Sequence, residues 1–367
     1  MATEHTRRRE RARQCLIKDG LDGFLITAEK NVKYLTGFTG DSTWLILTPD
    51  SELLISDFRY VTQLAEECSE VRNFIRKSKS KMTDATVEKL QDMALKRIAY
   101  EGHSLTCEIF QLLKDAAKSI EFHSLTWEIE KLRAVKDELE LAETREAVRL
   151  AEKGFGNLLE MLTPQATEQR LAYELEHAVR GFGGDELAFP PIIAVGDRSA
   201  LPHYRPGRLK IADSPILLVD WGAQTHSGYK SDLTRTVLTA HFSDAKFEKI
   251  YKTVLEAQLL AIEKIGPGVS TFAVDQVARD HIHAAGFGEY FDHGLGHGIG
   301  LDIHELPRFS QSSDTQLQPG MVVTVEPGIY LQGWGGVRIE DDVLVTHQGC
   351  ELLSSLPKDW ESVRVHI

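Results

Sequence analysis

The segment HGLGHGIGLDIHE, residues 293–305, holds three of the 14 histidines of the chain: His293, His297 and His304. The glycines between them allow close backbone approach and unusual torsions, so we expect the imidazoles to project from a tight loop and a strand. The same glycines would not sustain a helix, which disfavours a helical His-x-x-x-His zinc pair. A glycine-rich phosphate cradle is also disfavoured, because the segment lacks the GK[ST] and GxGxxG spacings.

Acidic residues accompany four apolar segments on either side of these histidines. They are Asp220 after ILLV, Asp232 in GYKSDLTRT, Glu326 after MVVTV and Glu340 in VRIEDDVLV. Taken singly, an aspartate of this kind marks a strand end or a turn. Taken together, several buried and unpaired carboxylates would each cost several kcal/mol, and Arg235 and Arg338 are too few to neutralise all four. A bound cation is the simplest remedy, so the pattern predicts a metal site.

The segment VRIEDDVLV, residues 337–345, predicts a strand whose two faces differ. Because side chains alternate along a strand, one face carries Arg338, Glu340 and Asp342. The other face carries Asp341 with its apolar neighbours. Arg338 and Glu340 are therefore expected side by side, with Asp341 directed away from them.

The hydrophobic pattern divides the chain into two domains, 1–132 and 133–367. In the first domain short apolar runs alternate with helical patterns, which predicts an α/β fold. Its expected strands cover 21–27, 43–48 and 52–56, and its expected helices cover 6–18, 59–67, 84–95 and 104–117. In the second domain, Asp137 and Glu140 match a D-x-x-E capping box at the start of a long helix. Its expected strands cover 215–220, 229–239, 321–326 and 337–345.

The composition is that of an ordinary soluble globular protein, with 367 residues of which 42% are hydrophobic and 26% charged. A formal net charge of -13 disfavours nucleic acid and anionic membranes as partners. The one basic cluster, 7–13, is interpreted as a solvated helix. No apolar stretch reaches the ~18 residues of a membrane span, and the four cysteines form no CxxC pair. We expect a cytoplasmic protein with reduced thiols.

Five motifs in order carry a family resemblance. They are D-x-G from Asp220, S-D-x-T-R-T at 231–236, H-G-L-G-H-G-I-G-L-x-x-H-E at 293–305, V-E-P-G-I-Y at 325–330 and R-I-E-D-D at 338–342. In this set the chain resembles the pita-bread metallopeptidases, the family of methionine aminopeptidase, aminopeptidase P and prolidase. The resemblance implies an α/β (α+β) architecture, with a C-terminal pita-bread catalytic domain preceded by a smaller, creatinase-like α/β domain.

The resemblance also implies two divalent metal ions and their ligands. The implied ligands are Asp220, Asp232, His297, Glu326 and Glu340, with Asp232 and Glu340 bridging the two ions. One imidazole and four carboxylates form a hard, oxygen-rich set that favours Mn(II) and leaves Co(II), Fe(II) or Zn(II) open. The gap between Asp220 and Asp232 is one residue longer than is usual in the family. We expect the hairpin turn to absorb the extra residue without moving either strand.

His293 resembles the pattern of aminopeptidase P, prolidase and creatinase rather than that of methionine aminopeptidase. In the first domain, LTGFTG at 35–40 and ISDFRY at 55–60 resemble signatures of the aminopeptidase P branch. These two signatures favour an Xaa-Pro aminopeptidase over the alternative, an Xaa-Pro dipeptidase or prolidase. A non-catalytic pita-bread binding protein is a third possibility, whose signature would be lost ligands. The expected substrates are proline-containing peptides. By resemblance, the first domain walls the active site of a partner subunit, which implies a homodimer or higher homo-oligomer.

The family resemblance assigns roles in hydrolysis to the remaining residues. A hydroxide bridging the two metals is expected to attack the carbonyl carbon of the first substrate residue. Glu326 is expected to pass its proton toward the proline nitrogen, and His304 to donate to the developing oxyanion. His203 and His293 are expected to contact the substrate. Arg338 is expected either to orient the ligand cluster or to meet a substrate carboxylate.

Overall fold

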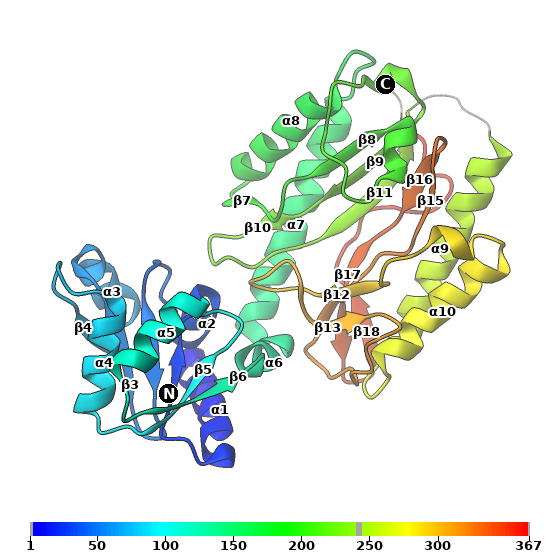
Figure 1. Ribbon diagram of the computed structural model, residues 1–367. Helices are drawn as coiled ribbons and strands as arrows, with labels where there is room; N and C mark the ends of the chain where they lie inside the picture. The colour runs from blue at the N-terminus through cyan, green and yellow to red at the C-terminus, as the bar shows by residue number, and fades with distance from the viewer. Residues whose placement is uncertain (1–2, 240–243, 366–367) are drawn as a thin grey trace. The chain divides into compact units, whose positions relative to one another are not determined.

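The computed structural model describes residues 3–239 and 244–365. The chain divides into two compact units, Met1–Arg133 and Ala134–Ile367 (Figure 1), which we call the N-terminal unit and the C-terminal unit. The boundary predicted from the sequence, at residue 132, lies next to this division. No helix in the described ranges combines the length and the apolar character needed to cross a membrane.

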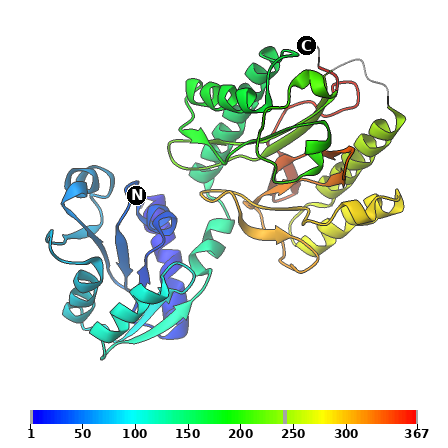
Figure 2. The same ribbon diagram turned by 45° about the horizontal axis from the view of Figure 1, so that its top comes forward.

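The N-terminal unit is built on a mixed six-stranded sheet of order β4-β3-β2-β1-β5-β6. Its strands are β1 Gly23–Ile26, β2 Trp44–Leu47, β3 Glu52–Ser56, β4 Arg72–Ile75, β5 Arg97–Glu101 and β6 Glu121–Leu125. Its helices are α1 Glu4–Asp19, α2 Glu29–Thr36, α3 Val61–Glu67, α4 Met82–Asp92, α5 Cys107–Ala116 and α6 Glu128–Ala134, with a short 3-10 turn η1 Phe58–Tyr60. Figures 1 and 2 show α1 and α2 on the opposite side of the sheet from α4 and α5.

The predicted α/β fold of this unit is confirmed, but the sequence pattern missed α2 and the strands β4 to β6. β4 and β6 are edge strands with mostly exposed or half-buried side chains, so they lack the apolar alternation that marks a half-buried strand. The interpretation of 7–13 as a solvated helix is wrong for two arginines. Arg8 and Arg9 are buried and donate to the carbonyl oxygens of Tyr34 and Leu35, which end α2 without helical partners.

The C-terminal unit contains a three-stranded sheet of order β11-β9-β8, a five-stranded sheet of order β13-β12-β14-β17-β18 and two strand pairs. Its strands are β7 Glu186–Leu187, β8 Ile192–Val195, β9 Ile216–Trp221, β10 Ala223–Gln224, β11 Leu233–Leu238, β12 Gly296–Gly298, β13 Glu305–Phe309, β14 Val322–Val325, β15 Gly328–Leu331, β16 Gly335–Arg338, β17 Asp341–Thr346 and β18 Gly349–Leu352. Its helices are α7 Glu138–Glu160, α8 Glu168–Gly181, α9 Ala245–Lys264 and α10 Thr271–Ala284, with 3-10 turns η2 Gly196–Ala200, η3 Ile211–Asp213 and η4 Gly288–Tyr290.

Two helix pairs cover the strands of the C-terminal unit from opposite sides, as Figure 1 shows with α7 and α8 in green and α9 and α10 in yellow. The first pair packs through residues such as Leu158 and Leu175 onto Leu217 and Val219 of β9. The second pair packs onto the core residues of β14, β16 and β17. The capping box predicted at Asp137 is present. The apolar faces of the strands therefore pack against the helices, and the polar residues at the strand ends remain available to form the site.

The predicted strand 337–345 is interrupted, which corrects the sequence-based expectation. β16 pairs with β15, whereas β17 pairs with β14. Glu340 lies at the change of partners, where it forms an isolated bridge with Thr234.

The long connection from β9 to β11 turns at Thr225, whose N–H donates to Tyr229 O at 2.9 Å. The pairing of β9 with β11 stays in continuous register. The long segment between Asp220 and Asp232 is therefore accommodated in the turn and does not interrupt the pairing of the two strands.

Candidate metal centre and active-site cavity

All nine site residues predicted from the sequence line one cavity of about 1210 Å³ in the C-terminal unit. They are His203, Asp220, Asp232, His293, His297, His304, Glu326, Arg338 and Glu340. Apolar side chains complete the wall, among them Phe189, Ile192 and Tyr290. A few convergent polar groups in an apolar wall are typical of a small-molecule site.

Three of these residues approach closely enough to share one metal ion. Asp232, His297 and Glu340 each offer one donor atom, and the three atoms all lie within 4.8 Å of one another. Glu326 joins them, since its Oε1 lies 3.3 Å from His297 Nε2. Asp220 is also close enough for its charge to raise the pKa of Asp232. The fold thus brings together all five predicted ligands.

Hydrogen bonds between neighbouring strands hold these donors in place. The register of β9 and β11 sets Asp220 opposite Thr234. Thr234 also holds Glu340, because its carbonyl accepts from the Glu340 N–H at 3.1 Å and its hydroxyl donates to Glu340 Oε2 at 2.6 Å. The main-chain N–H of Asp232 donates to Asp342 Oδ2 at 3.0 Å. Asp220, Asp232 and Glu340 are therefore positioned by one set of strand contacts.

The glycines on either side of His297 are required by close backbone packing. A Cβ atom on Gly296 would lie 2.1 Å from Thr324 O, and one on Gly298 would lie 2.0 Å from Leu306 O. Only glycine fits at such separations. The His297 N–H donates to Thr324 Oγ1 at 3.1 Å, so the histidine is held between β13 and β14 with its ring free to face the carboxylates.

The central carboxylates have too few protein donors. Asp220 Oδ1 and Asp232 Oδ1 are buried and have no hydrogen-bond partner among the described residues. Burial, together with the charges of Glu340 and Asp220, raises the pKa of Asp232 well above its usual value. Burial and the charges of Glu326 and Asp220 do the same to the pKa of Glu340. A divalent cation would supply the missing positive charge, so this donor set fits a bound metal.

The other ionisable groups of the cavity keep different protonation states. Burial is the largest influence on Glu326 and opposes its ionisation, but the hydrogen bond with His297 and the nearby positive charges together outweigh it, so the pKa lies below its usual value. Burial lowers the pKa of His304 to about 4 and also lowers the pKa of His293. Near neutral pH, Glu326 is therefore a carboxylate while His293 and His304 are neutral. His203 lies exposed on the loop between η2 and β9 and lines the same cavity.

Arg338 is a buried link between the carboxylates and the histidines. Its Nη2 donates to Asp220 Oδ2, its Nε donates to Thr234 Oγ1 at 3.1 Å and its Nη1 donates to Tyr330 Oη at 2.8 Å. Tyr330 Oη in turn lies 2.9 Å from His293 Nε2. Of the two roles predicted for Arg338, these contacts agree with orienting the ligand cluster. Tyr330 belongs to the V-E-P-G-I-Y motif, but the sequence did not reveal that it joins Arg338 to His293.

Arg308 is a cavity residue that the sequence analysis missed. It lies on β13 directly opposite His297 of β12 in the antiparallel register, and it lines the cavity. Its positive charge contributes to the lowered pKa of His304. No carboxylate among the described residues pairs with it, whereas Arg338 is bound to Asp220. The signal available in the sequence was a single basic residue four positions after His304, outside the five motifs.

Comparisons with known proteins agree with this geometry. The family model described as Metallopeptidase family M24 matches residues 142–347, and the Creatinase/Prolidase N-terminal domain matches residues 8–135. The chain belongs to metallopeptidase family M24. The predicted family and its two-part α/β architecture are therefore confirmed. Membership also makes the chain a peptidase. The family is one of metallopeptidases, which agrees with the candidate metal cluster of Asp232, His297 and Glu340.

Solved structures and curated relatives of family M24 resemble the whole chain. An Xaa-Pro dipeptidase of Pyrococcus horikoshii is 35% identical over 343 residues, which cover 93% of this chain and 95% of the relative. The structure of an Xaa-Pro dipeptidase from Bacillus anthracis has a TM-score of 0.93 and 36% identity, covering 99% of this chain and 100% of the other. An X-Pro aminopeptidase from Thermotoga maritima has a TM-score of 0.87 and 34% identity, with coverages of 95% and 98%. The balance of names favours the prolidase alternative over the predicted aminopeptidase P.

Proposed function

We propose that this M24 peptidase is an Xaa-Pro dipeptidase, a prolidase, which hydrolyses the bond before a C-terminal proline. The names of the two dipeptidase relatives support this specificity. The observation that carries it is Arg308, a guanidinium in the cavity wall opposite His297 without a carboxylate partner among the described residues. A dipeptidase must recognise the free carboxylate of its substrate, and a guanidinium is the side chain best matched to a carboxylate.

We assign the metal ligands to the five residues that converge in the cavity. Asp220, Asp232, His297, Glu326 and Glu340 would hold two divalent ions, and their oxygen-rich character favours Mn(II). Bound metal ions supply Lewis-acid polarisation of the scissile carbonyl and a nucleophile at neutral pH. The orphaned oxygens of Asp220 and Asp232 support this assignment, because a cation would satisfy both.

The remaining side chains would bind the substrate and move protons. Glu326 is ionised, so its carboxylate can accept a proton and return it to the proline nitrogen of the leaving group. Neutral His304 can donate a ring N–H to the oxyanion as it develops. His203 and His293 face the same cavity and would contact the peptide around the scissile bond. Arg338 would keep Asp220 in place through their ion pair.

The test is hydrolysis of an Ala-Pro dipeptide and an Ala-Pro-Ala tripeptide by the Mn(II)-loaded protein and its Arg308→Met variant. The dipeptide should be the preferred substrate of the wild-type protein. Arg308→Met should lower kcat/KM for the dipeptide by about tenfold to a hundredfold, which corresponds to a lost charged hydrogen bond. Arg308→Lys keeps the charge and should recover part of the loss. Arg149→Met, at an exposed arginine of α7 that does not line the cavity, is the matched control and should leave kcat/KM unchanged.

A second candidate function is an Xaa-Pro aminopeptidase, and the size of the cavity favours it. The volume of about 1210 Å³ exceeds the range of about 300–1,000 Å³ usual for small-molecule sites, which leaves room for peptides longer than two residues. In that case the tripeptide would be cleaved at least as well as the dipeptide, and Arg308→Met would affect both substrates alike. This result would replace the prolidase proposal.

A further inference from the structure

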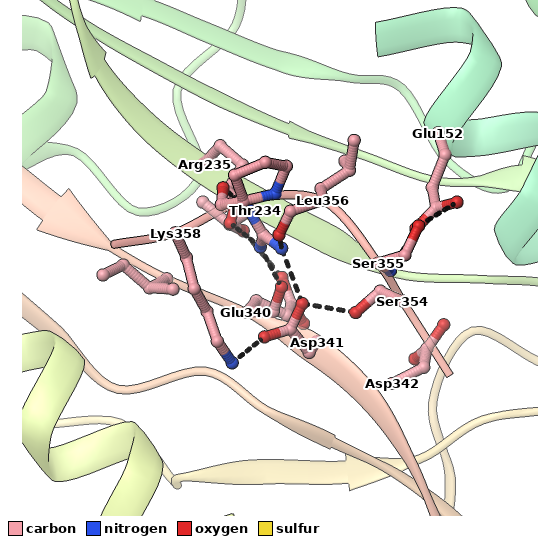
Figure 3. Close-up of polar contacts among 12 residues, drawn as sticks. Glu152, Thr234, Arg235, Glu340, Asp341, Asp342, Ser354, Ser355, Leu356 and Lys358 are labelled. Atoms are coloured by element: carbon pink, nitrogen blue, oxygen red, sulfur yellow. Dashed lines mark hydrogen bonds and ion pairs between the residues drawn. The ribbon is translucent and has the colours of Figure 1, made fainter. Parts of the chain in front are cut away.

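A buried polar cluster lies behind the proposed metal ligands, on the side of the strands away from the cavity. It consists of Arg235, Gln258, Asp341, Ser354 and Lys358, which we call the Asp341 hub. None of the five lines the cavity. Asp341 and Gln258 are fully buried and Arg235 is 2% exposed. Figure 3 shows Asp341 at the centre, with Arg235, Ser354 and Lys358 converging on its carboxylate.

Every oxygen of the Asp341 carboxylate is occupied by protein donors. Oδ1 accepts from Arg235 Nη2 at 2.7 Å and from Ser354 Oγ. Oδ2 accepts from Gln258 Nε2 at 3.0 Å and from Lys358 Nζ at 2.5 Å. Two cations and two neutral donors therefore compensate one buried charge, which is the condition under which a buried carboxylate is tolerated.

The hub also holds the main chain beside three of the proposed ligands. Arg235 Nη1 donates to Glu340 O at 2.7 Å and to Thr234 O at 2.9 Å. Gln258 Nε2 donates to Val325 O at 3.1 Å, the carbonyl that precedes Glu326. The carbonyl oxygens that accept from the hub thus belong to Glu340 itself, to Val325 directly before Glu326, and to Thr234 two residues after Asp232.

We propose that Asp341 and Arg235 are positioning residues for the metal site, which set the spacing of Asp232, Glu326 and Glu340 from behind the strands. Glu340 and Asp341 are adjacent in an extended segment, so their side chains leave the backbone on opposite faces. A rotation of the segment that displaces Asp341 therefore displaces Glu340 as well. Outer-shell contacts of this kind change metal affinity by about 10- to 100-fold when they are removed. This inference rests on the proposed metal site.

The C-terminal segment 354–358 completes the hub and offers a matched control. Ser354 and Lys358 bind Asp341, and the carbonyls of Leu356 and Pro357 accept from Arg235. Ser355 instead binds away from the hub, because its N–H and hydroxyl donate to Glu152 of α7 (Figure 3). Removing Glu152 loosens the same segment without touching Asp341.

The experiment measures Mn(II) binding to the metal-stripped full chain by titration calorimetry, with the melting temperature in EDTA as the folding control. Asp341→Asn should raise the Mn(II) Kd by about 10- to 100-fold, and Lys358→Met should raise it by a smaller factor in the same direction. Glu152→Gln should keep the wild-type Kd. With saturating Mn(II), Asp341→Asn should lower kcat for Ala-Pro and leave KM unchanged, because the hub does not contact the cavity.

Two outcomes would overturn the inference. One is a folded Asp341→Asn or Lys358→Met protein that binds Mn(II) as tightly as the wild type, and Lys358→Met decides the matter if Asp341→Asn does not fold. The other is an equal loss of affinity in Glu152→Gln, which would assign the effect to the C-terminal segment as a whole. Failure of the proposed function looks different, since then the wild-type protein itself would neither bind Mn(II) nor cleave Ala-Pro.

Discussion

Among the described residues, each unit of the chain contains one cluster of two carboxylates and a histidine with metal-like spacing, but the two clusters have different hydrogen-bond partners. In the N-terminal unit the cluster is Glu101, His103 and Glu130. Glu101 Oε2 accepts from the main-chain N–H groups of Thr27 and Ala28 at 2.6 and 2.7 Å. In the C-terminal unit the cluster is Asp232, His297 and Glu340.

An asparagine amide makes the difference between the two clusters. Asn31 Nδ2 lies 2.6 Å from both Glu101 Oε1 and Glu130 Oε1, so a neutral donor already occupies the space between these carboxylates. Arg133 Nη1 donates to Asn31 Oδ1 at 2.8 Å and adds positive charge nearby. No donor within the described part of the chain reaches Asp232 Oδ1. Each cluster keeps a buried oxygen without a partner among the described residues, Glu130 Oε2 in one and Asp232 Oδ1 in the other, so the amide placed between the carboxylates is what distinguishes them.

The largest expected effect is on catalysis. Asp232→Asn should lower kcat/KM for Ala-Pro by about 10³-fold or more, because metal ions supply several kcal/mol of transition-state stabilisation. Glu101→Gln should leave kcat/KM near the wild-type value. Steady-state kinetics on both variants, with circular dichroism to confirm folding, measure the contrast. Substantial activity in Asp232→Asn would remove the functional distinction between the clusters.

The next effect is on metal-dependent stability. Mn(II) at about 100 times its Kd should stabilise the folded C-terminal unit by about 2.7 kcal/mol, seen in calorimetry as a higher melting temperature than in EDTA. The shift should persist in Glu101→Gln and disappear in Asp232→Asn. If Glu101→Gln abolished part of the shift, the N-terminal cluster would also be a metal site, with the unpaired Glu130 Oε2 as one of its ligand atoms.

A smaller effect is expected on the N-terminal unit itself. Glu101→Gln should lower its free energy of unfolding by about 1–3 kcal/mol, because it leaves buried donors without their charged acceptor. The loss should be the same with Mn(II) and with EDTA. Glu66→Gln, at an exposed position of α3, is the matched control and should have little effect on urea denaturation.

The smallest effect concerns pH. The hydrogen bond from Arg59 lowers the pKa of Asp57 to about 2, with Arg76 adding to the effect. The folded pKa lies below the unfolded value of about 3.9, so the stabilisation is complete above that pH and is lost as the pH falls toward 2. Asp57→Asn should flatten the acid limb of the stability profile of the N-terminal unit. The change should be small because Arg59 is 50% exposed and water screens the pair. An unchanged acid limb would contradict this.

The sequence was sufficient for the family and the α/β class, and the nine site residues predicted from it all line one cavity, which Arg308 also lines. These features can be recognised from short stretches of sequence. Gly296 and Gly298 are required because neighbouring backbone lies too close for a Cβ atom, and an acidic residue that follows an apolar run can be read directly from the run. The predictions of strands and of buried residues failed where neighbouring residues in the sequence gave no sign of burial. The edge strands β4 and β6 lack an apolar pattern. Arg8 and Arg9 of α1 are buried against α2, which the pattern missed, and they donate to its carbonyl oxygens.

Pairing between distant residues could be known only from the folded chain. Asn31 satisfies Glu101 from 70 positions away, and Arg338 reaches Asp220 across 118 positions. The position of Arg308 opposite His297 likewise depends on the register of β12 and β13. Local sequence specifies which side chains can ionise or bind a metal. Whether a buried carboxylate is neutralised by protein donors or left for a cation depends on which strands and helices the fold places beside it, because the desolvation cost is offset only by groups within hydrogen-bonding distance.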